Sequence, residues 1–105
     1  MIKTINVEEL KKKLENGEEL LLVDCREQEE WNDGHISKAI LLPLSEFQDR
    51  FKELNQDATI IMQCRSGKRS LNACQILLEN DYEDMTNLEG GIMAWIEKGY
   101  DITKG

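Results

Sequence analysis

The sequence has few of the features that mark secreted, metal-binding or membrane proteins. Its three cysteines are an odd count, and their spacings match neither a zinc site nor a disulfide framework. No apolar run approaches the length of a membrane span. The first residues, 1–6, have neither the apolar core nor the cleavage site of a secretion signal. We therefore expect a cytoplasmic chain with reduced thiols, no metal and no membrane partner.

Features that would divide the chain into separate domains are also scarce. There is one proline, Pro43, and there is no Gly/Ser-rich linker, internal repeat or low-complexity tract in the 105 residues. Apolar residues make up 40% of the chain, which is enough for one core. We therefore expect a single domain over residues 1–105.

The balance of charge narrows the choice of partners. The net charge of −8 disfavours nucleic acid and anionic membranes as partners. A basic cluster stands out against this background, because Arg65, Lys68 and Arg69 lie within six positions of Cys64. The sequence therefore directs attention to the segment around this cysteine.

Apolar and β-branched runs alternate with helical patterns along the whole chain. The expected strands cover residues 2–5, 20–23, 39–42, 59–62 and 85–88. The expected helices are one capped by Asn6 and closed by Gly17, one over 27–31, one capped by Ser45, and two over 70–79 and 92–98. This order predicts an α/β fold with a mostly parallel sheet, which binds ligands beyond the carboxyl ends of its strands.

Cys64 lies at such a strand end, immediately before a helix. A tight loop there would point backbone N–H groups inward, and Gly67 allows the turn this needs. The helix dipole and the nearby cations would lower the thiol pKa and favour the nucleophilic thiolate. A buried, inert cysteine is the commoner alternative. It does not explain three cations and a glycine in the next five positions.

Two anion chemistries suit such a loop, and the residue count separates them. The tyrosine phosphatase signature is a cysteine, five residues and an arginine, whereas here Ser70 occupies the arginine position and Arg69 is one place early. A phosphate dianion needs the longer cradle and the guanidinium fork. The shorter loop favours a sulfur atom over a phosphate.

At these residues the chain resembles the rhodanese-like family, over nearly its whole length. The segments that carry the resemblance are Val23-Asp24-Cys25-Arg26-Glu27, Glu30-Trp31, Gly34-His35-Ile36, Ala39-Ile40, the loop Cys64-Arg65-Ser66-Gly67-Lys68-Arg69-Ser70, Leu88-Glu89-Gly90-Gly91 and Ala94-Trp95. Ser37-Lys38 departs from the pattern, because many members have Pro-Gly there. We expect this departure to alter a turn and not the chemistry.

The resemblance implies a five-stranded, mostly parallel sheet with helices on both faces. It also implies that the Cys64 thiolate takes the outer sulfur of a donor such as thiosulfate, and that the resulting persulfide passes the sulfur to cyanide, a thiol or a protein acceptor. No metal or organic cofactor is implied. The six-residue loop matches the sulfurtransferase branch of the family. A non-catalytic binding or sulfide-sensing module is the second hypothesis.

The loop residues that follow Cys64 are the predicted substrate-binding residues: Arg65, Ser66, Gly67, Lys68 and Arg69. Arg69 is the first choice for the anionic end of the donor, because guanidinium offers a planar fork to oxyanions. Lys68 would steer anions more generally. Arg65 either binds the donor or turns back to a carboxylate.

Other conspicuous residues have two interpretations each. Asp24 with Arg26, and the single histidine His35, are interpreted as structural in preference to catalytic. Cys25 and Cys74 are interpreted as core residues, the alternative being that one resolves an oxidised or persulfidated Cys64. Trp31 and Trp95 are predicted core anchors. Gly90-Gly91 is predicted to form a turn and a helix start in preference to a phosphate loop.

Overall fold

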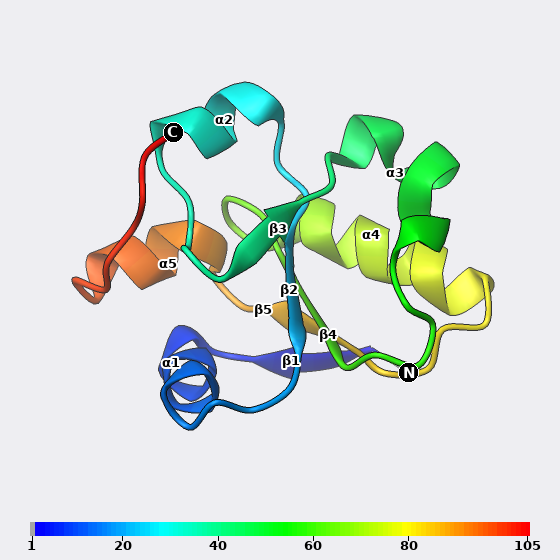
Figure 1. Cartoon of the computed structure of the whole chain (residues 1–105), viewed down its shortest axis with the longest axis horizontal. Coiled ribbons are helices and arrows are strands. Elements are labelled where there is room, and N and C mark those ends of the chain that lie inside the picture. The colour runs from blue at the N-terminus through cyan, green and yellow to red at the C-terminus, as the bar shows by residue number, and fades with distance from the viewer. Residues whose placement is uncertain (1) are drawn as a thin grey trace.

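The computed structural model describes residues 2–105, and its elements alternate along the chain (Figure 1). The strands are β1 (Lys3–Ile5), β2 (Leu21–Asp24), β3 (Ala39–Leu41), β4 (Ile60–Gln63) and β5 (Met85–Leu88). The helices are α1 (Val7–Glu15), α2 (Gln28–Asp33), α3 (Leu44–Arg50), the short 3-10 helix η1 (Phe51–Glu53), α4 (Lys68–Glu79) and α5 (Gly91–Glu97).

The strands form one sheet in the order β1-β5-β4-β2-β3, and every neighbouring pair is parallel. The predicted α/β class is therefore confirmed. β2 and β4 are adjacent, and their registers place Asp24 opposite Gln63. The carboxyl ends of these two inner strands consequently lie side by side at one edge of the sheet.

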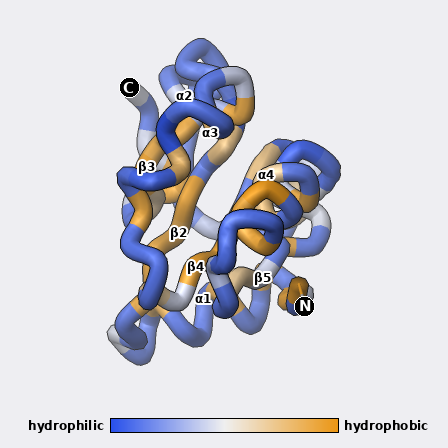
Figure 2. The backbone as a smooth tube through the Cα atoms, turned by 90° about the vertical axis from the view of Figure 1, so that its right-hand side faces the viewer, coloured by the Kyte–Doolittle hydropathy of each residue, from blue (hydrophilic) through white to orange (hydrophobic). Residues whose placement is uncertain are grey.

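Helices cover both faces of the sheet, α1 and α5 on one and α3 and α4 on the other (Figure 1). The strand side chains alternate between two buried clusters, as a parallel sheet requires. Val23 and Met62 point to the α3/α4 face, whereas Leu22 and Ile61 point to the α1/α5 face. Figure 2 shows the apolar strands enclosed by hydrophilic outer segments. The alternation places Cys25 and Cys64 in the α3/α4 cluster.

Local signals explain where most helices begin. α1 starts with the predicted capping box, in which the Glu9 N–H donates to Asn6 Oδ1 at 2.9 Å and Glu9 Oε1 accepts from the Asn6 N–H at 3.2 Å. Gly17, with φ of 69°, follows the end of this helix as predicted. α4 begins at Lys68, two residues before the predicted start at Ser70, because left-handed Gly67 is its N-cap.

The prediction that Ser45 caps helix α3 is wrong. The N-cap is Pro43, two residues before Ser45, and α3 starts at Leu44. The fixed φ of proline favours the extended conformation found there. The Ser45 hydroxyl is used elsewhere, because it donates to Glu27 Oε1 at 2.7 Å. This bond links α3 to the segment that precedes α2.

Within residues 2–105 no helix has the length and apolar character needed to cross a bilayer.

Candidate active site

Two cysteines lie side by side at the carboxyl edge of the sheet. Cys25 and Cys64 directly follow the paired residues Asp24 and Gln63, and the Cys25 N–H donates to the Gln63 carbonyl at 2.9 Å. Both side chains are buried in the cluster under α3 and α4, with 0% and 1% of their surface exposed. The fold therefore brings the predicted nucleophile together with Cys25, which the sequence analysis interprets as a core residue in preference to a resolving thiol.

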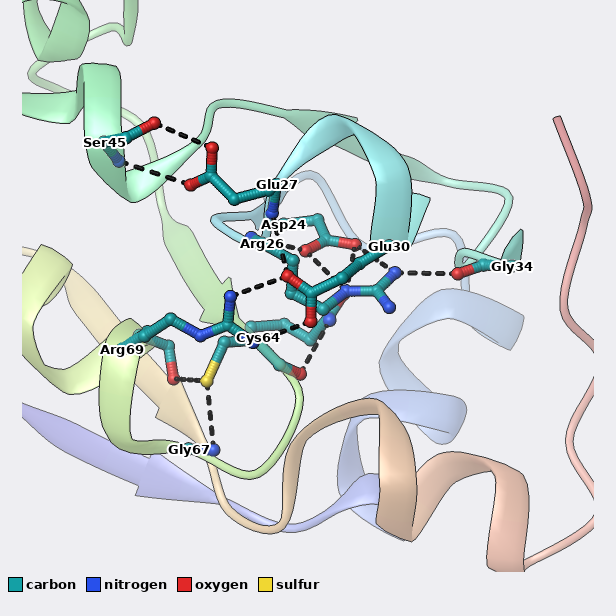
Figure 3. Close-up of polar contacts among 11 residues, drawn as sticks. Asp24, Arg26, Glu27, Glu30, Gly34, Ser45, Cys64, Gly67 and Arg69 are labelled. Carbon is teal, nitrogen blue, oxygen red and sulfur yellow. Dashed lines mark hydrogen bonds and ion pairs between the residues drawn. The ribbon is translucent and has the colours of Figure 1, made fainter. Parts of the chain in front are cut away.

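The chain after Cys64 wraps around its sulfur (Figure 3). The Gly67 N–H donates to Cys64 Sγ at 3.1 Å, and the Ser70 hydroxyl lies 3.3 Å from the same atom. Gly67 has φ of 113°, which a residue with a side chain adopts only with strain. The sulfur lies at the N-terminus of α4, where free N–H groups and the helix dipole favour a negative charge. The loop after Cys64 is therefore tight, with the Gly67 N–H facing the sulfur, and binding of an anionic substrate there stays a prediction.

These contacts shift the acidity of the two thiols in opposite directions. A hydrogen bond from the Cys25 thiol, assisted by Ser70 and the Gly67 N–H, lowers the pKa of Cys64 to about 4 although burial opposes this. The pKa of Cys25 is raised, because its hydrogen is bonded to the Cys64 sulfur and its side chain is buried. At neutral pH the pair therefore consists of a Cys64 thiolate and a neutral Cys25 donor.

The N-terminus of α5 braces the back of the loop. The Ile92 N–H donates to the Cys64 carbonyl at 2.9 Å, and the Met93 N–H donates to the Arg65 carbonyl at 3.1 Å. Gly91, with φ of 56°, permits this approach, because a Cβ there would come within 2.4 Å of the Arg65 carbonyl oxygen. Gly90 is the N-cap and Gly91 the first residue of α5, which confirms the predicted turn and helix start. The loop carbonyls are thus held away from the sulfur.

Asn87, from β5, also holds the loop, although no motif in the sequence singles it out. Its Oδ1 accepts from the Ser70 hydroxyl at 2.5 Å, and its Nδ2 donates to the Gly67 carbonyl at 3.1 Å. Because a hydroxyl has one hydrogen, Ser70 donates either to Asn87 or to Cys64 at any instant. The only available signal was a polar amide within the predicted strand 85–88, all of whose residues are buried in the structure.

The cations of the loop differ in their surroundings. Arg69 makes a two-armed ion pair with Glu30 of α2, with Nη1–Oε1 and Nη2–Oε2 distances of 2.7 and 2.8 Å. The Arg69 guanidinium lowers the pKa of Glu30 to about 2. Arg65 and Lys68 are exposed, and neither forms an ion pair within residues 2–105. The donor-binding role of Arg69 stays a prediction, and Glu30 is a site residue that sequence reasoning missed.

The Asp24–Arg26 pair forms a buried network beside the site. Arg26 Nη2 donates to Asp24 Oδ2 at 2.8 Å and to the Gly34 carbonyl at 2.7 Å. Asp24 has no exposed surface and Arg26 has 6%. Among residues 2–105 the hydrogen bonds to the Asp24 carboxylate come from Arg26, and no N–H of residues 65–69 donates to it. This geometry supports the structural interpretation.

His35 has structural contacts as well. Its ring stacks on Trp31 at a centroid distance of 3.7 Å, and its Nδ1 lies 3.0 Å from the Trp31 carbonyl oxygen. Its backbone pairs with Thr103. No hydrogen bond joins it to Cys64 among residues 2–105, so the geometry offers no Cys–His dyad.

The remaining predicted core residues behave as packing side chains. Trp95 is 3% exposed and belongs to the α1/α5 cluster, whereas Trp31 is partly buried against that cluster. Cys74 is a free thiol in the other cluster, and burial raises its pKa to about 12. No group of three potential metal ligands occurs within residues 2–105.

Comparisons with known proteins agree with this geometry. The family model of the rhodanese-like domain matches residues 6–98. The chain is 40% identical over 94 residues to YtwF of Bacillus subtilis, covering 90% of each chain. It is 38% identical over 102 residues to a sulfurtransferase of Allochromatium vinosum, covering 97% of this chain and 95% of the relative. Its structure is similar to the crystal structure of a rhodanese-like domain protein from Staphylococcus aureus, with a TM-score of 0.88, 31% identity and 99% coverage of both chains.

Proposed function

The chain belongs to the rhodanese-like sulfurtransferase family, and we propose from this premise that it transfers sulfane sulfur through a persulfide on Cys64. The donor is thiosulfate or a persulfide, and the acceptor is cyanide or a thiol. One observation carries the proposal: Cys64 Sγ lies inside a loop that donates the Gly67 N–H to it at 3.1 Å. That loop stabilises one negative charge on a sulfur atom.

In the first half-reaction, the Cys64 thiolate attacks the outer sulfur of the donor. With thiosulfate, a bond forms between Cys64 Sγ and that sulfur, and the S–S bond of the donor breaks with its electron pair leaving on sulfite. The depressed pKa of Cys64, about 4, keeps the nucleophile ionised without a separate base. The new outer sulfur carries the negative charge and extends about 2.05 Å beyond Sγ.

In the second half-reaction, the acceptor attacks the outer sulfur of the persulfide. Cyanide leaves as thiocyanate, or a thiol leaves as a new persulfide, and in both cases the Cys64 thiolate is restored. Because that thiolate has a low pKa, it is a good leaving group. A protein thiol is a further acceptor that fits this chemistry. The exposed side of the loop, at Arg65 and Lys68, would face it.

Mass spectrometry of the intact protein tests the proposal. After incubation with excess thiosulfate or alkyl persulfide and rapid desalting, we expect a gain of one sulfur atom that maps to the Cys64 peptide. Cyanide should remove it and yield one equivalent of thiocyanate. The Cys74→Ser variant is the matched control, because it removes another buried thiol and should still be loaded. A protein that gains no sulfur from either donor would overturn the proposal and favour a binding module.

A further inference from the structure

The charge next to Cys64 is smaller than the loop sequence indicates. Three cations follow the cysteine, but the guanidinium of Arg69 is paired at both ends with Glu30. About a third of each side chain is exposed, so the pair is neither isolated in solvent nor locked in the core. Figure 3 shows Arg69 of α4 reaching toward Glu30 of α2 beside the Cys64 sulfur.

Glu30 is held in place by more than Arg69. Its Oε1 also accepts from the Glu27 N–H at 3.1 Å, which makes Glu30 one half of the capping box of α2. The carboxylate is therefore fixed by its own helix before any substrate arrives. Glu30, and to a smaller extent the Cys64 sulfur, raises the pKa of Arg69, and Figure 3 places Arg69 beside that sulfur. Consequently a fixed negative charge accompanies a cation that lies beside the nucleophile (Figure 3).

This arrangement treats donors of different charge unequally. A dianion that approaches Arg69 meets a guanidinium whose charge is already balanced, and it is repelled by Glu30 and by the protein net charge of −8. A donor with one negative charge or none avoids most of this repulsion. It loses little, because attack by Cys64 needs only access to the outer sulfur.

We propose that the Glu30–Arg69 ion pair makes Glu30 a specificity-determining residue, which disfavours dianionic donors such as thiosulfate and favours persulfides. This inference rests on the proposed function and names the donor class of the same site. The step is the same for both donors. Cys64 Sγ bonds to the outer sulfur, and the electron pair of the broken S–S bond leaves on sulfite in one case and on a thiolate in the other.

The Glu30→Gln variant gives the sharpest test. Glutamine removes the charge but keeps an oxygen that accepts the Glu27 N–H, so the cap of α2 is retained. Glu29→Gln is the matched control, because it makes the same change of charge on the same helix at an exposed residue with no ion pair within residues 2–105. Circular dichroism should show that both variants fold.

The substrates form a series in charge. Thiosulfate is a dianion and methanethiosulfonate is a monoanion with the same sulfonyl–sulfur bond, so the two differ by one charge at the leaving group. The persulfide of a small uncharged thiol completes the series as a second monoanion, which differs in having a thiolate leaving group. We expect Glu30→Gln to raise kcat/KM for thiosulfate about tenfold, as for removal of roughly 1.4 kcal/mol of repulsion. The increase should be about threefold or less for methanethiosulfonate and for the persulfide, because each carries one negative charge. Glu29→Gln should change all three by a factor below about two.

Two further measurements test whether the charges of Glu30 and Arg69 act on thiosulfate turnover in opposite directions. Arg69→Ala leaves Glu30 unpaired, so kcat/KM for thiosulfate should fall about tenfold or more, with a smaller loss for the monoanion. High salt should shrink the difference between Glu30→Gln and the parent protein. The Arg69→Ala variant keeps the inference testable even if Glu30→Gln fails to fold.

Some results would contradict the inference directly. If Glu30→Gln changed kcat/KM for all three donors by one common factor, Glu30 would have only a structural role. If Arg69→Ala left the ratio of thiosulfate to monoanion turnover unaltered, the pair would not select donors. Failure of the proposed function looks different, because then the parent protein itself would transfer sulfur from no donor.

Discussion

Two neighbouring segments of this molecule share the dipeptide Cys-Arg and have opposite chemistry. β2 and β4 are each followed by Cys-Arg and then by a helix, as Cys25-Arg26 and Cys64-Arg65. The first cysteine is a neutral thiol whose arginine is buried against Asp24, whereas the second is a thiolate whose arginine is exposed. The shared Cys-Arg pair therefore does not account for the difference.

The backbone accounts for it. After Cys64 the chain turns through left-handed Gly67, so that an N–H faces the sulfur and α4 starts directly behind it. Before α2 the chain passes through extended Glu27, and no N–H of that segment donates to the Cys25 sulfur among residues 2–105. Since only one of two adjacent thiols can ionise cheaply, the one that receives the N–H becomes the thiolate and the other its hydrogen-bond donor.

Replacement of each cysteine by serine should give the largest difference in sulfur-transfer activity between the two segments. Cys64→Ser should abolish sulfur transfer, by roughly 10³-fold or more, because a hydroxyl forms no persulfide. Cys25→Ser should remain active, since its hydroxyl still donates to Cys64. Steady-state thiocyanate formation measures both. Substantial activity in Cys64→Ser together with loss in Cys25→Ser would reverse the assignment.

Substitution of Arg26 should lower the free energy of unfolding far more than substitution of Arg65. Arg26→Met leaves the fully buried Asp24 carboxylate unpaired, which should cost about 3–5 kcal/mol of unfolding free energy. Arg65→Met alters an exposed side chain and should change that free energy by no more than about 0.5 kcal/mol. Urea unfolding compares the two variants. Equal losses would mean that the buried network does not distinguish the two segments.

Removing the brace behind the Cys64 loop should make the two segments more alike. Gly91→Ala places a Cβ against the Arg65 carbonyl and pays for a left-handed alanine, whereas Gly99→Ala, with φ of 78°, meets nothing within 4 Å. The control should lose about 1–2 kcal/mol of stability. Gly91→Ala should lose roughly a further 1–3 kcal/mol. Gly91→Ala should also lose sulfur transfer, measured by persulfide loading, and full loading would show that the brace is dispensable.

The smallest expected effect concerns the hydrogen bond between the thiols. Cys25→Val removes the donor and should raise the pKa of Cys64 from about 4 by about one unit or more, equivalent to roughly 1.4 kcal/mol. Cys25→Ser should restore part of the shift. The pH dependence of iodoacetamide alkylation reports the pKa, because only the thiolate reacts. Alkylation of the parent protein should slow only as the pH falls toward 4, and a Cys25→Val profile identical to it would remove Cys25 from the site.

Local patterns predicted most of the fold. Capping by Asn6, the glycine at 17 and the alternating strands give the right elements because short-range chemistry decides them. The prediction at Ser45 was wrong because a long-range contact there outweighs the local capping preference. A serine is a good N-cap in isolation, but here a distant carboxylate, Glu27, takes its hydroxyl. No local rule weighs that competition.

The residues of the candidate site likewise fall into those that local sequence can identify and those that only long-range contacts reveal. Cys64, Gly67 and Ser70 could be selected from sequence, because consecutive residues build the loop around one sulfur. Asn87 and Glu30 could not, since each reaches the loop from an element far along the chain. The pairing of Cys25 with Cys64 needed the order of the strands, which places β2 beside β4. Family resemblance supplied the order of the motifs and not these contacts.

The tether at the C-terminal end of the described chain has a consequence for dynamics. The Thr103 and His35 backbones exchange two hydrogen bonds, and the Gly105 N–H donates to the Asn32 carbonyl, so residues 103–105 are bound to α2 and the segment after it. α2 has only six residues and no fully buried side chain, so it has little stability of its own. Its amide protons and those of residues 103–105 should therefore exchange with solvent as one cooperative unit, opening more often than the central strands.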